Sequence, residues 1–316
     1  MTRPSGEQVE ISHGDQRVVV VEVGGGLRTY SVAGRAVLDG YGADEMSRSG
    51  RGQALIPWPN RLEDGSYEFA GRRHQVPIDE PEKNNAIHGL VRWASWTVGR
   101  RRPESVVMEH LLHPRPGYPF SLALSIEYAL SDTGLSVTTT ATNRGPDPCP
   151  YGCGSHPYLA LGTERIDSLL LRAPGGTVLS SDERGLPSGR SPVEGTEYDF
   201  RRPRLIGATR LDSCFTDLER DADGLAHVRI EDPESRKALA LWADNRYGYL
   251  MLFTGDPLPD VNRRSLAVEP MSCPPNAFRS GEALIRLAPG ASFTSSWGIA
   301  PRTARRVGPR SNFQFG

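Results

Sequence analysis

Residues 120–142 read FSLALSIEYALSDTGLSVTTTAT, and this stretch decides the fold class. On both sides of residues 131–134, apolar side chains alternate with small or polar ones. Successive side chains of a strand point to opposite faces, so the alternation predicts two strands that each bury one face. The Asp and Gly between the two runs favour a turn, and we therefore expect a long antiparallel hairpin.

Similar patterns cover most of the chain. Further strands are predicted at residues 17–23, 66–69, 72–76, 96–100, 105–112, 226–231, 238–242, 247–253, 282–287 and 292–299. No segment has the spacing of a long amphipathic helix, and 34 glycines and 26 prolines interrupt every region. Strands that follow strands without helices between them exclude a doubly wound nucleotide-binding fold and favour a β-sandwich or barrel.

The length of 316 residues suits either two ordinary domains or one large β domain. Neither an internal repeat nor a low-complexity linker divides the chain. We therefore expect a single β-sandwich domain over residues 1–301. The segment 302–316 is rich in Arg, Pro and Ser and is expected to be a loosely packed C-terminal extension.

The charge composition gives no sign of a charged macromolecular partner. There are 37 basic and 38 acidic residues, and the formal net charge is −1. A nucleic-acid or membrane partner held by electrostatics is therefore not expected. The first residues are polar, and no apolar run approaches the ~18 residues of a membrane helix. These features predict a cytoplasmic protein that acts on a small molecule.

The cysteines Cys149, Cys153, Cys214 and Cys273 would allow two disulfides, but reduced thiols suit a cytoplasmic chain better. Cys149, Cys153 and His156 are one conceivable set of metal ligands. Their spacing lacks the usual C-x2-C pair, and a fourth ligand is not evident. We therefore expect small buried thiols, no metal and no cofactor.

One stiff segment contains three candidates for substrate binding. In Pro57-Trp58-Pro59-Asn60-Arg61, two prolines fix the backbone beside the Trp, Asn and Arg side chains. A Trp face can pack against the apolar side of a sugar ring, and an Arg can donate to hydroxyls or anions. The structural alternative is a packed Trp beneath a surface Arg.

Two histidines lie in short segments dense in Gly, Pro, Asn and aromatics, which suggests functional loops on a rigid scaffold. His88 precedes Gly89, where the missing side chain would let a ligand come close. His156 follows a glycine-rich stretch and lies two residues before Tyr158. An imidazole can carry a proton at neutral pH, and a structural histidine with a satisfied hydrogen bond is the alternative for each.

Two carboxylates complete the set of candidates. Glu269 follows the apolar run 266–268, so burial should raise its pKa and make it a usable base near neutrality. Asp212 alternates into an apolar strand start and could bind ligand hydroxyls. The alternatives are a glutamate paired with an arginine and an aspartate that caps a turn.

The order of these motifs resembles that of the aldose 1-epimerases, the galactose mutarotase family. The match runs from about residue 57 to residue 278, and no single motif in it is specific on its own. The motifs are an Asn-Arg pair, Asn-x-x-His-Gly, His-Pro-Tyr, Asp-x-x-Phe and a late Glu before Pro-x-Asn-Ala. Their shared order over this length makes the resemblance specific.

The resemblance implies a large antiparallel β-supersandwich with an open cleft, and an enzyme that interconverts the α- and β-anomers of a free hexopyranose. It implies that Glu269 takes the proton of the anomeric hydroxyl while His156 protonates the ring oxygen, so that the ring opens and recloses. His88 would support the ring oxygen, and Arg61 and Asp212 would hold hydroxyls. The remaining candidates for substrate contact are Asn60, Trp58, Tyr158 and Arg92.

Three departures from the family pattern bear on the choice of sugar. Bulky and basic groups follow His88-Gly89, the His-Pro-Tyr motif continues as Leu-Ala-Leu, and Met271 replaces a Gln. They resemble a bacterial branch with relatives that accompany sulfoquinovose breakdown. Arg92 could pair with an anionic group on such a sugar, or it could be a solvated or structurally paired arginine.

Two rival functions are weighed against the isomerase. The same fold could hold sugars without turnover, but a pure binder needs no acid and base such as His156 and Glu269. A glycoside hydrolase or lyase typically uses two carboxylates, whereas one candidate catalytic carboxylate accompanies two histidines here. We therefore expect a cofactor-free aldose 1-epimerase, an isomerase that acts on a free hexose or a close derivative.

Overall fold

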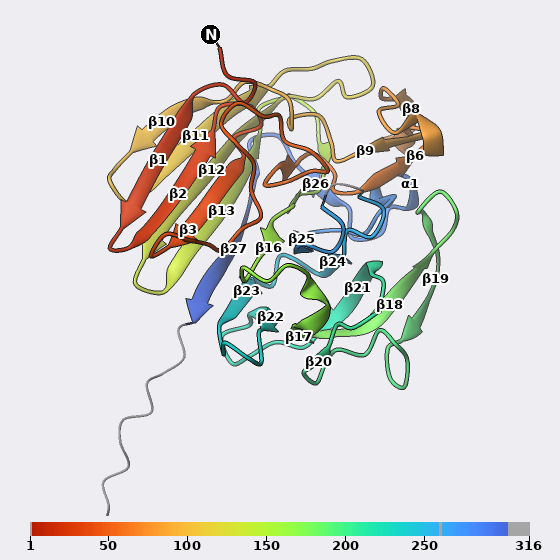
Figure 1. Ribbon diagram of the computed structural model, residues 1–316. Coiled ribbons are helices and arrows are strands. Elements are labelled where there is room, and N and C mark those ends of the chain that lie inside the picture. The colour runs from red at the N-terminus through yellow and green to blue at the C-terminus, as the bar shows by residue number, and fades with distance from the viewer. Residues whose placement is uncertain (1, 259–260, 303–316) are drawn as a thin grey trace, which may run out of the picture.

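The computed structural model describes residues 2–258 and 261–302, and its regular elements are almost entirely antiparallel strands (Figure 1). This confirms the expected fold class. Within the described residues, the helices are single turns, namely η1 (Pro81–Lys83), η2 (Ile166–Ser168) and α1 (Ala277–Ser280).

The hairpin predicted from residues 120–142 forms β12 (Leu122–Ser131) and β13 (Gly134–Asn143). The two strands pair along their whole length, and every second residue of β12 is buried, as the alternation predicts. The hairpin belongs to a nine-stranded sheet. In order, that sheet contains β10 (Thr97–Arg101), β11 (Ser105–Leu112), β12, β13, β27 (Ser292–Arg302), β23 (Ala238–Ala243), β22 (Ala226–Glu231), β17 (Leu170–Arg172) and β20 (Arg204–Leu205).

A second sheet has eight strands and carries much of the candidate site. In order, it contains β19 (Pro187–Pro192), β18 (Gly175–Ser181), β21 (Asp212–Leu218), β24 (Tyr249–Phe253), β25 (Leu266–Met271), β15 (Gly154–Ser155) and β5 (Ala54–Leu55), with β16 (Tyr158–Leu159) also paired to β25. A four-stranded sheet contains β1 (Gln8–His13), β2 (Gln16–Val21), β3 (Leu27–Val32) and β4 (Arg35–Ala36). Three two-stranded ribbons are β6 (Arg61–Glu63) with β9 (Asn85–Ile87), β7 (Ser66–Phe69) with β8 (Arg72–Gln75), and β14 (Cys149–Tyr151) with β26 (Ile285–Leu287).

The predicted hairpins are confirmed, and one hairpin that was not predicted lacks the sequence pattern of a strand pair. The strands predicted at 66–69 and 72–76 pair as β7 and β8, those at 96–100 and 105–112 as β10 and β11, and those at 226–231 and 238–242 as β22 and β23. The hairpin of β18 and β19 was missed because β19 is exposed at every residue and therefore shows no alternation. The last strand continues to Arg302, and the other residues of the predicted extension, 303–316, lie outside the described residues.

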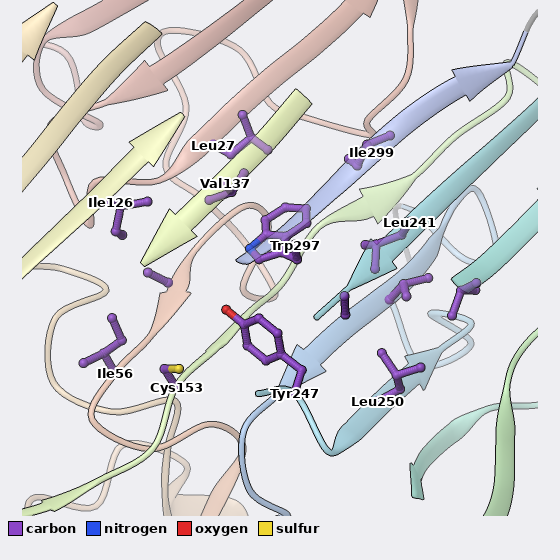
Figure 2. Packing of buried hydrophobic residues seen from close by; sticks show 14 of the residues in the cluster. Leu27, Ile56, Ile126, Val137, Cys153, Leu241, Tyr247, Leu250, Trp297 and Ile299 are labelled. Atoms are coloured by element: carbon purple, nitrogen blue, oxygen red, sulfur yellow. The ribbon is translucent and has the colours of Figure 1, made fainter. Parts of the chain in front are cut away.

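The hydrophobic core joins the three sheets (Figure 2). The nine-stranded sheet contributes Ile126 and Trp297, the four-stranded sheet Leu27, and the eight-stranded sheet Leu250. All four belong to one cluster of buried side chains. Because β25 lies inside this packed assembly, each of its six residues is buried, including the glutamate at its fourth position.

Candidate active site

Strand register brings Glu269 and His156 face to face. β15 and β16 flank the segment that carries His156, and both pair with β25, with Gly154 opposite Met271. Continuing that antiparallel register by two residues places His156 opposite Glu269. The two side chains meet, with His156 Nε2 3.3 Å from Glu269 Oε1.

Packing orients the imidazole of His156. Its ring stacks on Tyr158, with centroids 5.0 Å apart and planes 9° apart. Gly50 has a φ of +75°, and a Cβ there would lie 2.5 Å from His156 Cδ2, so a side chain at this position would displace the ring. Arg51 lies 4.2 Å from the centroid of Tyr158, and its Nη2 donates to Asp39 Oδ2 at 3.2 Å. His156 Nδ1 has no hydrogen-bond partner.

His88 stands beside His156, with ring centroids 5.3 Å apart and planes at 74°. The pairing of β6 with β9 brings His88 opposite Asn60, because Arg61 pairs with Ile87 one position further in. The Asn60 N–H donates to His88 Nδ1 over 3.2 Å. A ring nitrogen that accepts a hydrogen bond carries no proton, so neutral His88 holds its proton on Nε2. This leaves Nε2 as the donor of His88.

Glu269 is a carboxyl group in an apolar setting. Its side chain is 3% exposed, and its Oε2 has no hydrogen-bond partner. Cys214, Met251 and Glu269 are opposite one another on successive strands, so their side chains share one face of the sheet. Burial raises the pKa of Glu269 well above its usual value, Asp212 raises it further, and Arg61 opposes them.

Burial shifts the two histidines in the opposite direction. It is the largest cause that lowers the pKa of His156 to about 3, and the pKa of His88 also falls well below its usual value. The positive charge of Arg92 lowers the pKa of both imidazoles further. The site therefore favours the neutral forms of all three groups, and a proton placed on one of them has a short path to the next.

The predicted hydroxyl-binding groups surround this centre. Arg61, at the start of β6, donates from Nε and Nη2 to the carboxylate of Glu80, each at 2.9 Å. Asp212, at the start of β21, is exposed. Asp212 is opposite Phe253, which is opposite Ala267, so Asp212 lies on the same face of the sheet as Glu269. Arg61 follows Asn60, whose N–H donates to His88.

Arg92 lies near both histidines but has a partner within the protein. Its Nη2 is 2.6 Å from Asp79 Oδ2, and its side chain is 14% exposed. Arg92 was expected either to pair with an anionic group on the sugar or to be a solvated or structurally paired arginine. Its contact with Asp79 is that of a structurally paired arginine. Its Nε is buried without a hydrogen-bond partner, which leaves one donor unused.

Two other predicted contacts are buried in the protein itself. Trp58 is 2% exposed and packs on Phe278 with ring centroids 5.3 Å apart, so its ring belongs to the core. Tyr158 is also 2% exposed, and its hydroxyl donates to Ser49 O at 2.8 Å. Tyr158 therefore reaches the candidate site through its stack on His156.

The close neighbour of Gly89 is the main chain. Its φ is +76°, and a Cβ there would lie 2.0 Å from Ile56 O. The glycine at position 89 is thus required for packing of the loop against the main chain, and the expectation that it admits a ligand is not needed to explain it. The supports Arg51, Asp79 and Glu80 were not predicted, and the glycines on both sides of Arg51 were the one available signal.

His88, His156 and Glu269 also form a possible set of metal ligands. Among residues 2–258 and 261–302, the ligand atoms of His88, His156 and Glu269 lie within 4.8 Å of one another, and no other such group is found. Two imidazoles and a carboxylate are donors that zinc accepts. Cys149 and Cys153 do not join this group, so the cysteine-containing ligand set has no geometric support.

The sequence matches the family model described as Aldose 1-epimerase over residues 7–300. The uncharacterized protein YihR of Escherichia coli strain K12 is 36% identical over 287 residues, which cover 90% of each chain. The maltose epimerase of Levilactobacillus brevis is 26% identical over 248 residues, covering 70% of this chain and 71% of the relative.

Solved structures share the fold. A galactose mutarotase-like protein from Clostridium acetobutylicum has a TM-score of 0.83 at 18% identity and covers 94% of this chain and 95% of its own. The galactose 1-epimerase from Lactobacillus acidophilus NCFM has a TM-score of 0.76 at 21% identity, over 94% and 95% of the two chains. The described residues contain no helix that is long and apolar enough to span a membrane. The expected galactose mutarotase-like fold is thus confirmed, and the chain belongs to the aldose 1-epimerase family.

Proposed function

We propose that the protein is an aldose 1-epimerase that interconverts the α- and β-anomers of a free hexopyranose by acid- and base-catalysed ring opening. The observation that carries the proposal is the 3.3 Å contact between His156 Nε2 and Glu269 Oε1, both on buried side chains. Membership of the family and relatives named for maltose and galactose support it.

The proton count of the pair explains how the ring opens. An imidazolium with a carboxylate contains as many protons as a neutral imidazole with a carboxylic acid. Ring opening converts the first arrangement into the second, because His156 gives a proton to the ring oxygen and Glu269 takes one from the anomeric hydroxyl. Burial disfavours the charged arrangement, so it favours this transfer. After the aldehyde rotates, the reverse transfer closes the ring as the other anomer.

The other residues assist without carrying the proton. His88 is neutral and donates from Nε2, so it can stabilise negative charge that develops on the ring oxygen. Arg61 and Asp212 supply a donor and an acceptor for sugar hydroxyls, and Asn60 contributes through the main-chain contact that sets the tautomer of His88. These steps use side chains of this chain and draw on no cofactor.

A neutral hexose is the better supported substrate class. Arg92 would be the natural partner of an anionic substituent such as the sulfonate of sulfoquinovose, but Asp79 already neutralises it at 2.6 Å. A non-catalytic carbohydrate-binding protein is also less well supported, because burying an unpartnered carboxyl oxygen and an unpartnered imidazole nitrogen costs stability. A binding protein gains nothing from this cost in stability, whereas an enzyme that moves protons uses the shifted pKa values that burial produces.

A cytoplasmic location is part of the proposal. Cys149, Cys153, Cys214 and Cys273 are all free and buried. Reduced thiols suit the reducing cytoplasm.

Exchange NMR on equilibrated sugars tests the proposal. Samples of glucose, galactose, maltose and a charged hexose are mixed with the protein, and cross peaks between the α- and β-anomeric protons are recorded. We expect an exchange rate proportional to protein concentration for at least one sugar. Shift changes that report binding, without exchange for any sugar of the panel, would favour the binding protein instead.

A further inference from the structure

The hairpin of β18 and β19 reaches from the edge of the eight-stranded sheet to the ribbon of β6 and β9 (Figure 1). β19 is exposed at every residue, so the hairpin is held by packing on the β18 side only, where Val178 and Leu179 are buried. The turn at residues 182–186 is ordered by Asp182, whose Oδ1 accepts the main-chain N–H groups of Arg184 and Leu186 at 2.9 Å. The turn is therefore a defined structure, ordered by Asp182 and by the buried side chain of Leu186.

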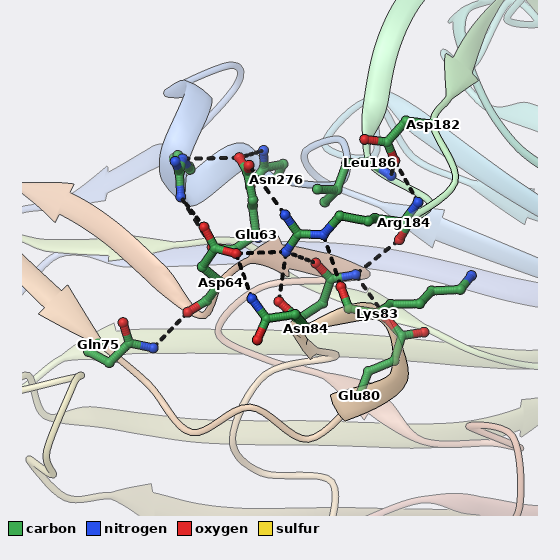
Figure 3. Close-up of polar contacts among 12 residues, drawn as sticks. Glu63, Asp64, Gln75, Glu80, Lys83, Asn84, Asp182, Arg184, Leu186 and Asn276 are labelled. Carbon is green, nitrogen blue, oxygen red and sulfur yellow. Dashed lines mark hydrogen bonds and ion pairs between the residues drawn. The ribbon is translucent and has the colours of Figure 1, made fainter.

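Arg184 fastens this turn to the segment that leads into His88 (Figure 3). Its Nε donates to Lys83 O at 2.9 Å, and its Nη2 donates to Asn84 O and Asp64 Oδ1, each at 2.8 Å. All of these acceptors lie on the ribbon of β6 and β9 or its connections. The side chain is 32% exposed, so the contacts form at the surface but converge on one guanidinium.

A short chain of hydrogen bonds continues from Arg184 to Arg61. The Nδ2 of Asn85, which is fully buried, donates both to Arg184 O and to Glu80 Oε2, each at 3.0 Å. Glu80 Oε2 also accepts from Arg61 Nε at 2.9 Å. The same amide thus holds the turn and the counter-ion of Arg61 together.

The turn also touches Arg61 directly. Gly185 has a φ of +75°, and a Cβ there would lie 2.5 Å from Arg61 Nη1. The guanidinium of Arg61 is therefore enclosed by Glu80 on one edge and by the turn on another. Its position depends on two segments that are about a hundred residues apart in the sequence.

We propose that Arg184 is a positioning residue that clamps the 182–186 turn against Arg61 and so fixes the direction in which Arg61 donates to the sugar. The inference rests on the proposed role of Arg61 in binding a hydroxyl. Arg184 does not contact the proton-transfer pair, so it should act on sugar affinity and leave the chemical step unchanged.

Arg184→Ala and Arg190→Ala are the matched variants. Arg190 lies on the same hairpin and pairs with Glu282 at 2.8 Å, so its loss removes a comparable surface charge from the other end. With the best hexose of the panel, we expect Arg184→Ala to raise KM about tenfold while kcat changes less than about twofold, in line with the loss of charged hydrogen bonds. Arg184→Lys should recover part of the loss, and Arg190→Ala should leave both constants unchanged.

A second pair of variants tests the contact if Arg184→Ala folds poorly. Gly185→Ala and Gly195→Ala carry the same backbone penalty, with φ of +75° and +73°, but a Cβ at Gly195 meets nothing within 4 Å. We expect Gly185→Ala alone to raise KM. The inference is overturned if Arg61→Ala raises KM while Arg184→Ala and Gly185→Ala do not, or if these variants lower kcat instead. If Arg61→Ala itself leaves KM unchanged, the proposed role of Arg61 fails.

Discussion

The candidate site has two halves that are built in opposite ways. In the proton-transfer half, the side chains of His156 and Glu269 are 6% and 3% exposed, and each has a polar atom without a hydrogen-bond partner. In the hydroxyl-binding half, Arg61 pairs with the carboxylate of Glu80, and Asp212 is exposed. The proton-transfer pair is thus buried and incompletely hydrogen-bonded, whereas the hydroxyl-binding groups are either paired with a counter-ion or exposed to solvent.

The difference fits the role that we propose for each half. A desolvated group without partners has a strongly shifted pKa and can exchange a proton readily. A charged group held by a counter-ion keeps its charge and a fixed direction, which suits recognition of hydroxyls. Substitutions in the first half should therefore lower kcat, and substitutions in the second should mainly raise KM.

The largest effect is expected from Glu269→Gln. The variant keeps the shape of the side chain but lacks the base, so anomer exchange should fall below detection while sugar binding is largely kept. Exchange NMR measures the rate, and titration of the sugar measures the affinity. Turnover close to that of the unaltered protein would remove Glu269 from the mechanism.

The two histidines should separate by the size of their effects. His156→Asn removes the acid and should cost about a hundredfold or more in kcat, the usual worth of general acid catalysis. His88→Asn removes one hydrogen bond at the ring oxygen and should cost about tenfold. If His88→Asn were the more damaging variant, the two imidazole roles would have to be exchanged.

The pH dependence should reflect the pair rather than an ordinary histidine. The pair of His156 and Glu269 holds one proton when it is active. Because the pKa of His156 is lowered to about 3, the pair binds a second proton only in strongly acidic solution. Because the pKa of Glu269 is raised well above the usual glutamate value of 4.5, the pair loses its remaining proton only at a correspondingly higher pH. Activity needs one proton on the pair, so kcat/KM should persist at about pH 5 and fall on the alkaline side. An acid limb near the usual histidine value of 6.5 would contradict this.

The smallest effect is expected from Arg92→Ala. Because Arg92 is paired with Asp79, its removal should change KM by less than about threefold for neutral and charged hexoses alike. Steady-state kinetics on glucose and on a sulfonated or phosphorylated hexose make the comparison. A loss confined to the charged sugar would revive the anionic-substrate alternative.

The sequence predicts the fold better than it predicts how the candidate site is assembled. The hairpin of β12 and β13 can be predicted because each strand has ten residues, and buried and less buried side chains alternate along almost the whole length. The order of the family's motifs also identifies His88, His156 and Glu269 as candidate site residues. Their meeting depends on β15 and β16, which are two residues long and too short to show any period.

The supports of the site were harder to foresee because they depend on contacts between distant segments. Arg184 and Asn85 are joined across 99 positions, and no local pattern marks such a pair. Trp58 was expected at the substrate, yet burial against Phe278 gives more apolar contact than a solvated position would. The burial of Trp58 and the hydrogen bond between Asn85 and Arg184 arise only when distant segments pack together, so the local sequence does not predict them.

The central claim is that a buried acid and base open the sugar ring, and an oxygen-18 experiment tests it most directly. Ring opening keeps the anomeric oxygen on C1 as the carbonyl oxygen, whereas displacement of that hydroxyl by water replaces it. Anomer exchange and oxygen-18 uptake at C1 are followed together by carbon-13 NMR in labelled water. We predict exchange far faster than enzyme-dependent uptake. Uptake that keeps pace with exchange would contradict ring opening and indicate substitution at C1.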